Sequence, residues 1–236
     1  MVQLPRSTTI RGPAFIRSLA NLGGGELRAH GGGLAARLSE WLDINHAIAL
    51  SAALDRARTT ASSTSADADD ALAEGIRIRA ELAAAIDRDR AFESGPDAPS
   101  DSSFFRQRHL ALQQTMEARI SELRNKLREQ LTQVGAEQAR LAAVDAVMER
   151  ALSRRERGLL ARAPVLLSRH FERLQQSAQV IAEAAEGANS PPPPLPATSS
   201  AWLDTFRQDM RHTLHAELDV RLYPIEGLLA ALRTTS

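Results

Sequence analysis

The sequence predicts an all-α protein: an elongated helical bundle built on a long coiled-coil-like helical hairpin, with flexible linkers. Apolar residues recur at intervals of seven or four over most of the chain, which is the spacing of helix faces. Aromatic residues make up only 4% of the 236 residues. Much of the 43% apolar content is therefore alanine, which favours helix but buries little area. No alternating run rich in valine and isoleucine indicates a strand.

The longest helical pattern runs from about Asp101 to Glu186. A seven-residue repeat forms a narrow seam that another helix must cover. The residues of this seam are Ile120, Leu127, Val134, Leu141 and Met148, with Met116, Leu123 and Val144 at companion positions. A continuous helix from Asp101 to Arg157 would be roughly 80 Å long. A hairpin within the chain and a homodimer would both cover the seam.

Two positions interrupt this pattern. Gly135 lies between Gln130 and Glu137, which occupy companion positions of the repeat. We interpret Gly135 as a surface irregularity of a continuous helix; the alternatives are a bend or a polar layer that sets the register. Farther along, Ala163-Pro164 predicts a turn or strong kink, because proline disrupts a helix interior.

The N-terminal part, residues 1–56, is predicted to contain short helices and a glycine-rich connector. A helical pattern begins at Pro13 and places Phe15, Ile16 and Leu19 on one side. Two glycine triplets, residues 23–25 and 31–33, bracket the connector. Two further apolar helix faces follow, the first comprising Leu34, Leu38, Trp41 and Leu42, and the second Ile44, Ile48 and Leu54.

The remaining boundaries follow from composition. Residues 57–70 contain no large apolar side chain and predict a linker. Residues 71–186 form the helical, coiled-coil body, which begins with a helix from about Ala71 to Phe92. Residues 187–200 include four consecutive prolines and predict a stiff extended linker.

Residues 201–236 predict C-terminal amphipathic helices. Their apolar residues step by four along one stripe: Trp202, Phe206, Met210, Leu214, Leu218 and Leu222. Such a stripe is more often core than binding surface. If it folds back on the long helix, it covers both seams; if it does not, it is a candidate docking face. Pro224 is expected to end or kink the helix, and Ile225, Leu228, Leu229 and Leu232 to form a last short one.

Residues able to carry chemistry are scattered. The absence of cysteine excludes disulfides, thiolate metal sites and thiol nucleophiles. His212 and His215 lie three positions apart on a helix, but a third metal ligand is not identified, so we expect an ordinary partly exposed pair. His109 and His170 could meet in a hairpin, yet nothing positions a nucleophile beside them. We therefore expect no catalytic residue, no cofactor, no metal and no small-molecule substrate.

Charge is distributed unevenly although the net charge is zero. Seven arginines face only two glutamates between Arg150 and Arg173, whereas ten acidic residues face four arginines between Asp67 and Asp101. These regions could lie side by side in the fold or in a dimer. Alternatively, the arginine-rich turn could bind nucleic acid or lipid headgroups. The candidate anion-binding residues are Arg150, Arg154, Arg155, Arg157 and Arg162. With few aromatic residues nearby for base stacking, nucleic-acid binding is disfavoured.

Several blocks of the sequence together carry a resemblance to a known family. They are residues 4–6 and 11–17, then Leu38-Ser39-Glu40-Trp41-Leu42 and residues 47–54, and finally residues 216–222, Pro224 and residues 227–229. These blocks resemble an uncharacterised proteobacterial family, the domain-of-unknown-function family numbered 3348. Ile44-Asn45-His46 departs from the family pattern, which leaves the local cap geometry open. The family has no assigned activity, so the resemblance implies no catalytic residue. Its genes often neighbour those of stator-like proton channels and peptidoglycan-binding outer-membrane-type proteins, which implies at most a cytoplasmic accessory of an envelope complex.

We therefore expect a non-enzymatic α-helical scaffold that binds a protein partner or itself through helix pairing. No stretch approaches the roughly 20 apolar residues of a membrane span. Arg17 interrupts the only apolar run near the start, so no signal peptide is expected and a cytoplasmic location is the default, with peripheral envelope association open. The alternative function is an anion-binding regulator that acts through the arginine-rich turn.

Overall fold

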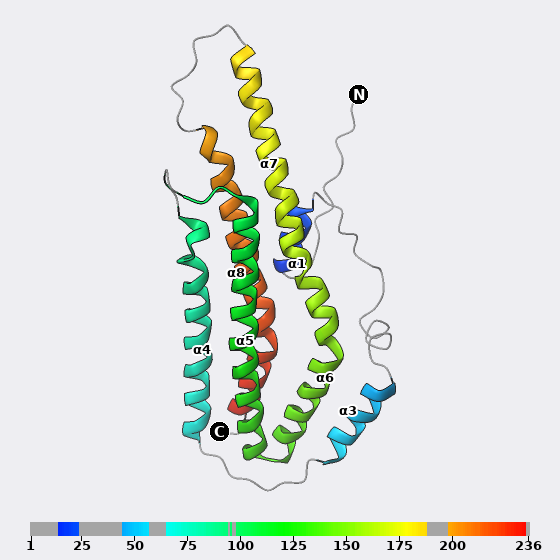
Figure 1. The fold of residues 1–236 in the computed structure, drawn as a ribbon. Helices are drawn as coiled ribbons and strands as arrows, with labels where there is room; N and C mark the ends of the chain where they lie inside the picture. The colour runs from blue at the N-terminus through cyan, green and yellow to red at the C-terminus, as the bar shows by residue number, and fades with distance from the viewer. Residues whose placement is uncertain are drawn as a thin grey trace, which may run out of the picture.

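All secondary structure that is described in the chain is helical, which confirms the all-α class. The structure is a computed structural model and describes residues 14–23, 44–56, 65–93, 95, 98–187 and 198–234. Its elements are α1 (Ala14–Leu22), α3 (Ile44–Arg56), α4 (Ser65–Asp87), the 3-10 turn η1 (Arg90–Phe92), α5 (Ser102–Val134), α6 (Ala136–Leu160), α7 (Arg162–Gly187) and α8 (Thr198–Arg233). They form an elongated bundle (Figure 1).

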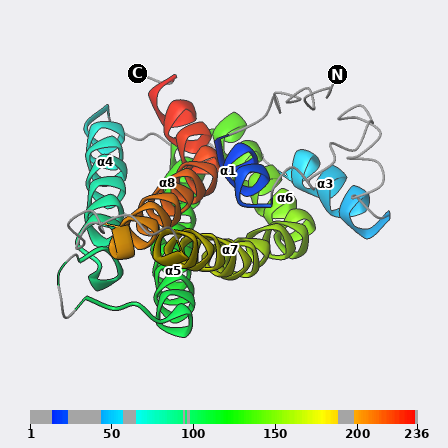
Figure 2. The same cartoon turned by 90° about the horizontal axis from the view of Figure 1, so that it is seen from above.

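Helix α8 is the centre of this bundle and contacts α1, α4, α5, α6 and α7. Seen from above, it lies between α4 on one side and α1 and α7 on the other (Figure 2). Its four-residue apolar stripe explains this position, because Phe206, Met210, Leu214, Leu218 and Leu222 are all at most 3% exposed. Trp202 is partly buried against the same core. The stripe offered above as a docking face is therefore internal, covered by the chain's own helices.

The chain reverses direction at Gly135, so the prediction of one continuous helix from Asp101 to Arg157 is wrong. Helix α5 ends at Val134, and α6 begins at Ala136 and returns alongside α5 (Figure 1). Gly135 is fully extended, with φ 176° and ψ 176°, and no side chain caps the start of α6. The interpretation of Gly135 as a surface irregularity is also wrong. A hairpin within the chain covers the α5 seam.

The reversal changes which residues of the heptad seam are buried. Ile120 and Leu127 are 7% and 1% exposed, whereas Leu141 is 40% exposed. Val134 and Met148 are partly buried. Because α6 meets α5 with a new orientation after the turn, its buried side chains are Ala142, Val147, Ala151 and Leu160. The seven-residue repeat therefore predicts which side chains are buried in α5, but it does not predict which are buried in α6.

The predicted break near Pro164 is a bend. Helix α6 ends at Leu160, Ala161 keeps right-handed helical angles, and α7 begins at Arg162. Pro164 lies in the first turn of α7, where its missing N–H needs no helical partner. Helix α7 therefore continues upward from α6 (Figure 1). The hairpin predicted for about 103–186 closes at Gly135 instead.

Two other boundaries differ from the sequence prediction. Helix α4 begins at Ser65, so residues 65–70 of the predicted 57–70 linker are helical. Helix α8 runs through Pro224 to Arg233 as one element, so the predicted separate last helix is wrong. Buried side chains on both sides of the proline, Leu222 and Ile225 among them, hold this part of α8 in the core. Packing therefore overrides the local cost of proline.

The short N-terminal helices behave differently from each other. Helix α1 buries Phe15 and Leu19 completely, as predicted, in a second cluster with Leu160, Ala163 and Ala216. Helix α3 packs against α6, yet its predicted apolar face is turned outward, with Ile44 75% exposed and Ile48 62% exposed. The predicted glycine-rich connector, the face of Leu34, Leu38, Trp41 and Leu42, and the proline run lie outside the described residues.

Candidate functional site

A buried polar cluster joins α5 to α8 in the middle of the bundle. Glu217 is fully buried, and Oε2 accepts a hydrogen bond from Gln113 Nε2 at 2.8 Å. Arg221 Nε donates to Glu217 Oε1 at 2.9 Å. His109 Nε2 lies 3.7 Å from Glu217 Oε2. Gln113 Nε2 also reaches the carbonyl of Leu160 at 3.2 Å, which satisfies a free acceptor at the end of α6.

The charge of Glu217 is stabilised in place by these partners. Burial alone would raise the pKa of its carboxyl group, but His109, Arg221 and Gln113 outweigh burial, and the pKa lies below its usual value. His109, Gln113 and Arg221 all approach the Glu217 carboxylate, and Gln113 also reaches the end of α6. The cluster therefore fixes three helices relative to one another.

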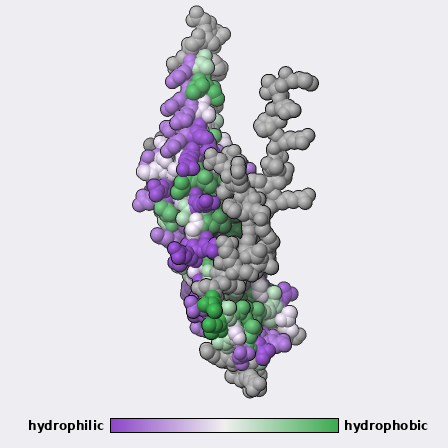
Figure 3. Space-filling model, turned by 90° about the vertical axis from the view of Figure 1, so that its right-hand side faces the viewer, coloured by the Kyte–Doolittle hydropathy of each residue, from purple (hydrophilic) through white to green (hydrophobic). Residues whose placement is uncertain are grey.

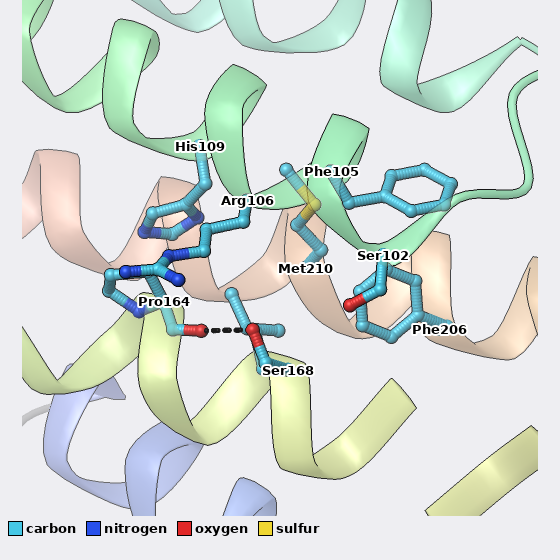
Figure 4. A pocket seen from close by; sticks show the side chains of 9 residues that line it. Ser102, Phe105, Arg106, His109, Pro164, Ser168, Phe206 and Met210 are labelled. Atoms are coloured by element: carbon cyan, nitrogen blue, oxygen red, sulfur yellow. Dashed lines mark hydrogen bonds between the residues drawn. The ribbon is translucent and has the colours of Figure 1, made fainter. Parts of the chain in front are cut away.

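A small cavity lies on the other side of His109 (Figure 4). Its volume is about 10 Å³, which is room for about one water molecule. Residues from α5, α7 and α8 line it, among them Arg106, His109, Pro164 and Met210. Ser168 Oγ donates to the Pro164 carbonyl at 3.0 Å on its α7 side (Figure 4). The space is too small for a substrate.

A network of four charged residues joins α5 to α6, and sequence reasoning missed it. Arg124 and Arg128 both bind Asp145, with Arg124 Nε 2.9 Å and Arg128 Nε 2.7 Å from Oδ2. Both arginines also reach Glu149. Burial opposes ionisation of Asp145, but the two guanidinium groups outweigh it and hold the pKa of Asp145 below its usual value. Charged residues on two separate helices gave no sequence signal, since only the turn at Gly135 brings them together.

Most arginines of the arginine-rich turn form no ion pair with another described residue. Arg150, Arg154, Arg162 and Arg169 are exposed, and none of them forms an ion pair with another described residue. Arg155 is also exposed, and it interacts with another residue. Arg157 Nε donates a hydrogen bond to the Ser153 carbonyl at 3.3 Å. Arg150 and Arg157 line a groove of about 300 Å³ between α5, α6 and α8.

The ion pairs of the described acidic side chains between residues 69 and 101 do not involve this turn. Helix α4 instead pairs with α5 and α8: Arg119 with Glu81, Lys126 with Glu74, and His215 with Asp87. Asp89, just after α4, binds Arg108 of α5 and also accepts a hydrogen bond from the Ala91 amide at 2.9 Å. The prediction that the two oppositely charged regions lie side by side is wrong for the single chain.

The histidines singled out in the sequence are placed separately. His215 Nε2 is 2.9 Å from Asp87 Oδ1, whereas His212 lines a groove between α1, α7 and α8. His170 Nε2 is 2.8 Å from Asp209 Oδ2, and His109 belongs to the buried cluster. In the part of the chain that the structure describes, no group of three histidines, cysteines or carboxylates could hold a metal ion.

Helix α7 leaves the bundle above a cluster of aromatic side chains. The rings of Phe171 and Phe206 are 5.0 Å apart, and those of Phe171 and Trp202 are 5.1 Å apart. Phe105 joins the same cluster from α5. Beyond this aromatic cluster α7 continues, and there Val180 is 64% exposed and Ile181 is 67% exposed. We call residues 175–184 the α7 end.

Apolar residues gather at several places on one face of the molecular surface (Figure 3). One apolar area lies high, over the α7 end, and another lies low, beside α3 and α6, with further apolar residues between them (Figure 3). Among the residues that can be described, no helix has the length and apolar character needed to cross a membrane.

Comparison with known proteins identifies the family of this chain. No curated protein and no solved structure matches the chain. A family model described as "Protein of unknown function (DUF3348)" matches residues 1–234. Because this match covers nearly the whole chain, it agrees with the resemblance noted in the sequence, and the chain belongs to the DUF3348 family.

Proposed function

We propose that this protein is a non-enzymatic α-helical interaction protein that presents the α7 end to a helix of a partner protein. The exposure of Val180 and Ile181 on a helix that projects past its own core carries this proposal. The resemblance to a family whose genes neighbour those of envelope complexes supports a cytoplasmic accessory role. The partner would then be a protein of such a complex.

The spacing of the α7 end favours a helical partner. Leu174, Ala178 and Ile181 follow one another at intervals of four and three, which places them on one side of the helix. Leu174 is the last of them to pack against the core. Ala178 and Ala182 are small, so a second helix can approach closely. A helix of this length gains most of its stability from packing. A partner helix would supply the packing contacts that the bundle does not give the α7 end.

The charge of the α7 end predicts a contact that resists salt. Between residues 175 and 184, Glu183 is the only charged side chain, and the other polar residues are glutamine and serine. Screening acts on exposed charges and leaves apolar contacts intact. We therefore expect the complex to survive high salt.

The test is affinity purification of the tagged chain from its native cells, with soluble and detergent-solubilised membrane extracts kept apart. Val180→Asp/Ile181→Asp should lose the partner, because it places two charges on the contact surface. Gln175→Asp/Gln179→Asp places the same number of charges on the opposite side of the α7 end and should retain the partner. All four positions are exposed, so neither variant should change stability by more than about 0.5 kcal/mol.

A photoreactive side chain at Ile181 then identifies what lies against the α7 end. Attachment to a helical segment of an envelope protein supports the proposal. Attachment to a second copy of the chain would indicate self-association in place of binding to another protein. The native mass of the protein should then fall to half in Val180→Asp/Ile181→Asp. Equal recovery of the same proteins by both double variants contradicts the proposal.

The second candidate function is anion binding through the arginine-rich turn. The exposed arginines that form no ion pair with other described residues, Arg150 and Arg154 among them, favour it. It predicts binding to DNA or to anionic vesicles that falls steeply with salt and is lost in Arg150→Glu/Arg154→Glu. Binding that ignores salt, or that survives the charge reversal, contradicts it.

A further inference from the structure

His109 is a polar side chain that the fold buries completely in α5. Neither of its ring nitrogens forms a hydrogen bond with another described residue. The distance of 3.7 Å from His109 Nε2 to Glu217 Oε2 is longer than a hydrogen bond, so this contact is an electrostatic attraction only. Buried polar groups of folded proteins are nearly always bonded to the protein or to ordered water. His109 therefore needs a further partner.

The small cavity next to His109 can hold that partner. Ser102, Arg106 and His109 line it from α5, and Ser168 lines it from α7 (Figure 4). Its volume of about 10 Å³ is room for about one water molecule and excludes an organic ligand. A cavity of this size with only apolar walls would stay dry. This one has polar side chains on two of the helices that enclose it, so it can bind water.

The hydrogen-bonding groups of the lining match those of a water molecule. A neutral imidazole has one donor and one acceptor nitrogen. The Glu217 carboxylate only accepts, so the nearby His109 Nε2 carries the proton and Nδ1 is an acceptor. Ser168 Oγ uses its own proton in the 3.0 Å bond to the Pro164 carbonyl, so it too is an acceptor toward the cavity. The guanidinium group of Arg106 has only donors.

We propose that the cavity beside His109 is a binding site for one water molecule. The water donates its two protons to His109 Nδ1 and Ser168 Oγ and accepts from Arg106, which gives it the three bonds typical of a buried water. Polar contacts then run from Glu217 of α8 through His109 of α5 and the water to Ser168 of α7. The water joins three helices near the start of α7. Because the α7 end takes no part, the inference goes beyond the proposed function and does not depend on it.

The test counts the long-lived water molecules of the full chain by oxygen-17 magnetic relaxation dispersion, which detects waters that stay bound for longer than the protein takes to tumble. His109→Phe keeps a ring but removes both nitrogens, so we expect it to hold one long-lived water fewer than the wild type. Thr213→Val is the matched control. Thr213 is also fully buried, but it does not line the cavity, so this variant should keep the water.

A second variant and a direct measurement keep the test decisive if His109→Phe alters the far-ultraviolet circular dichroism spectrum. Ser168→Ala removes the acceptor on the α7 side and should also lose one long-lived water. In the wild type, a rotating-frame Overhauser effect should connect water to the carbon-bound ring protons of His109. The absence of this effect, an unchanged number of long-lived waters in both variants, or an equal loss in Thr213→Val would overturn the inference.

Discussion

The α4–α5–α8 side of the bundle and the α6–α7 side use the same residue types in opposite ways. On the first side most leucines of α5 and α8 are buried, and several charged residues of α4 pair with residues of α5 and α8. On the second side Leu141, Val180 and Ile181 are exposed. Arg150, Arg154 and Arg162 of the turn form no ion pair with other described residues. The first side builds the fold, and the second carries surface that is available to other molecules.

The largest expected effect compares two leucines of the same heptad seam. Leu127→Ala removes a side chain that is 1% exposed and should cost about 2–5 kcal/mol of unfolding free energy. Leu141→Ala, at a 40% exposed position, should cost less than about 1 kcal/mol. Chemical denaturation of both variants gives the difference. Equal costs would show that the seam continues through Gly135.

Glu217→Gln tests the buried polar cluster. An amide cannot stabilise Arg221 as a carboxylate does, and breaking a buried ion pair costs about 3 kcal/mol. Because the pKa of Glu217 is lower in the folded chain than its ordinary value of 4.5, its contribution is complete above that value and is lost as pH falls through the folded pKa.

The advantage of the wild type over Glu217→Gln should therefore be constant at neutral pH and shrink below about pH 4.5. Urea denaturation between neutral and acid pH measures it. A constant difference at every pH would mean that the pKa of Glu217 is not lowered in the folded chain.

Asp145→Asn tests the charged network between α5 and α6. The network is only partly buried, so the loss should be about 1–2 kcal/mol, smaller than for Glu217. Glu122→Gln is the control, because Glu122 is 70% exposed and its pair with Arg119 should contribute almost nothing. Thermal unfolding at low and high salt distinguishes the two, and equal small losses would place Asp145 among ordinary surface charges.

The smallest expected effect is that of Gly135→Ala. Any residue can adopt the extended angles of Gly135, and a new Cβ would meet only the flexible end of Gln138 at 3.1 Å. We expect a change within about 1 kcal/mol and no change of fold. Spin labels on cysteines at Asn125 and Arg150 would be about 38 Å apart along one helix but much closer across the hairpin. A long distance in either protein would contradict the hairpin.

Much of this architecture could be predicted from local spacing. The four-residue stripe of α8 and the heptads of α5 indicate buried faces because the side chains that bury them are large and regularly placed. The reversal at Gly135 could not be predicted, because Leu141 and Met148 continue the seven-residue phase of α5 although the chain has turned back. Pro224 predicts the end of a helix that in fact continues, because buried side chains on both sides of the proline hold the helix in the core.

The candidate sites were harder to foresee than the helices. Glu217, Asp145 and Asp209 look like ordinary helix-surface charges in sequence. The pairing of Glu217 with Arg221 four residues later is local, but only tertiary placement buries Glu217 beside His109 and pairs Asp145 with Arg124 and Asp209 with His170. The exposed arginines were recognised from their density, which is a local property. Whether the acidic side chains of α4 reach these arginines depends on where α4 packs, and the sequence alone does not determine that.

Hydrogen exchange followed by mass spectrometry tests the contrast between the two sides most directly. Amides of α5 and α8 should exchange slowly in the isolated chain, and amides of residues 175–184 should exchange quickly, because no buried side chain holds that part of α7. Addition of the partner identified by cross-linking should slow exchange in the α7 end and leave α8 unchanged. Slow exchange of the α7 end in the isolated chain would contradict the account, because that segment would already be covered.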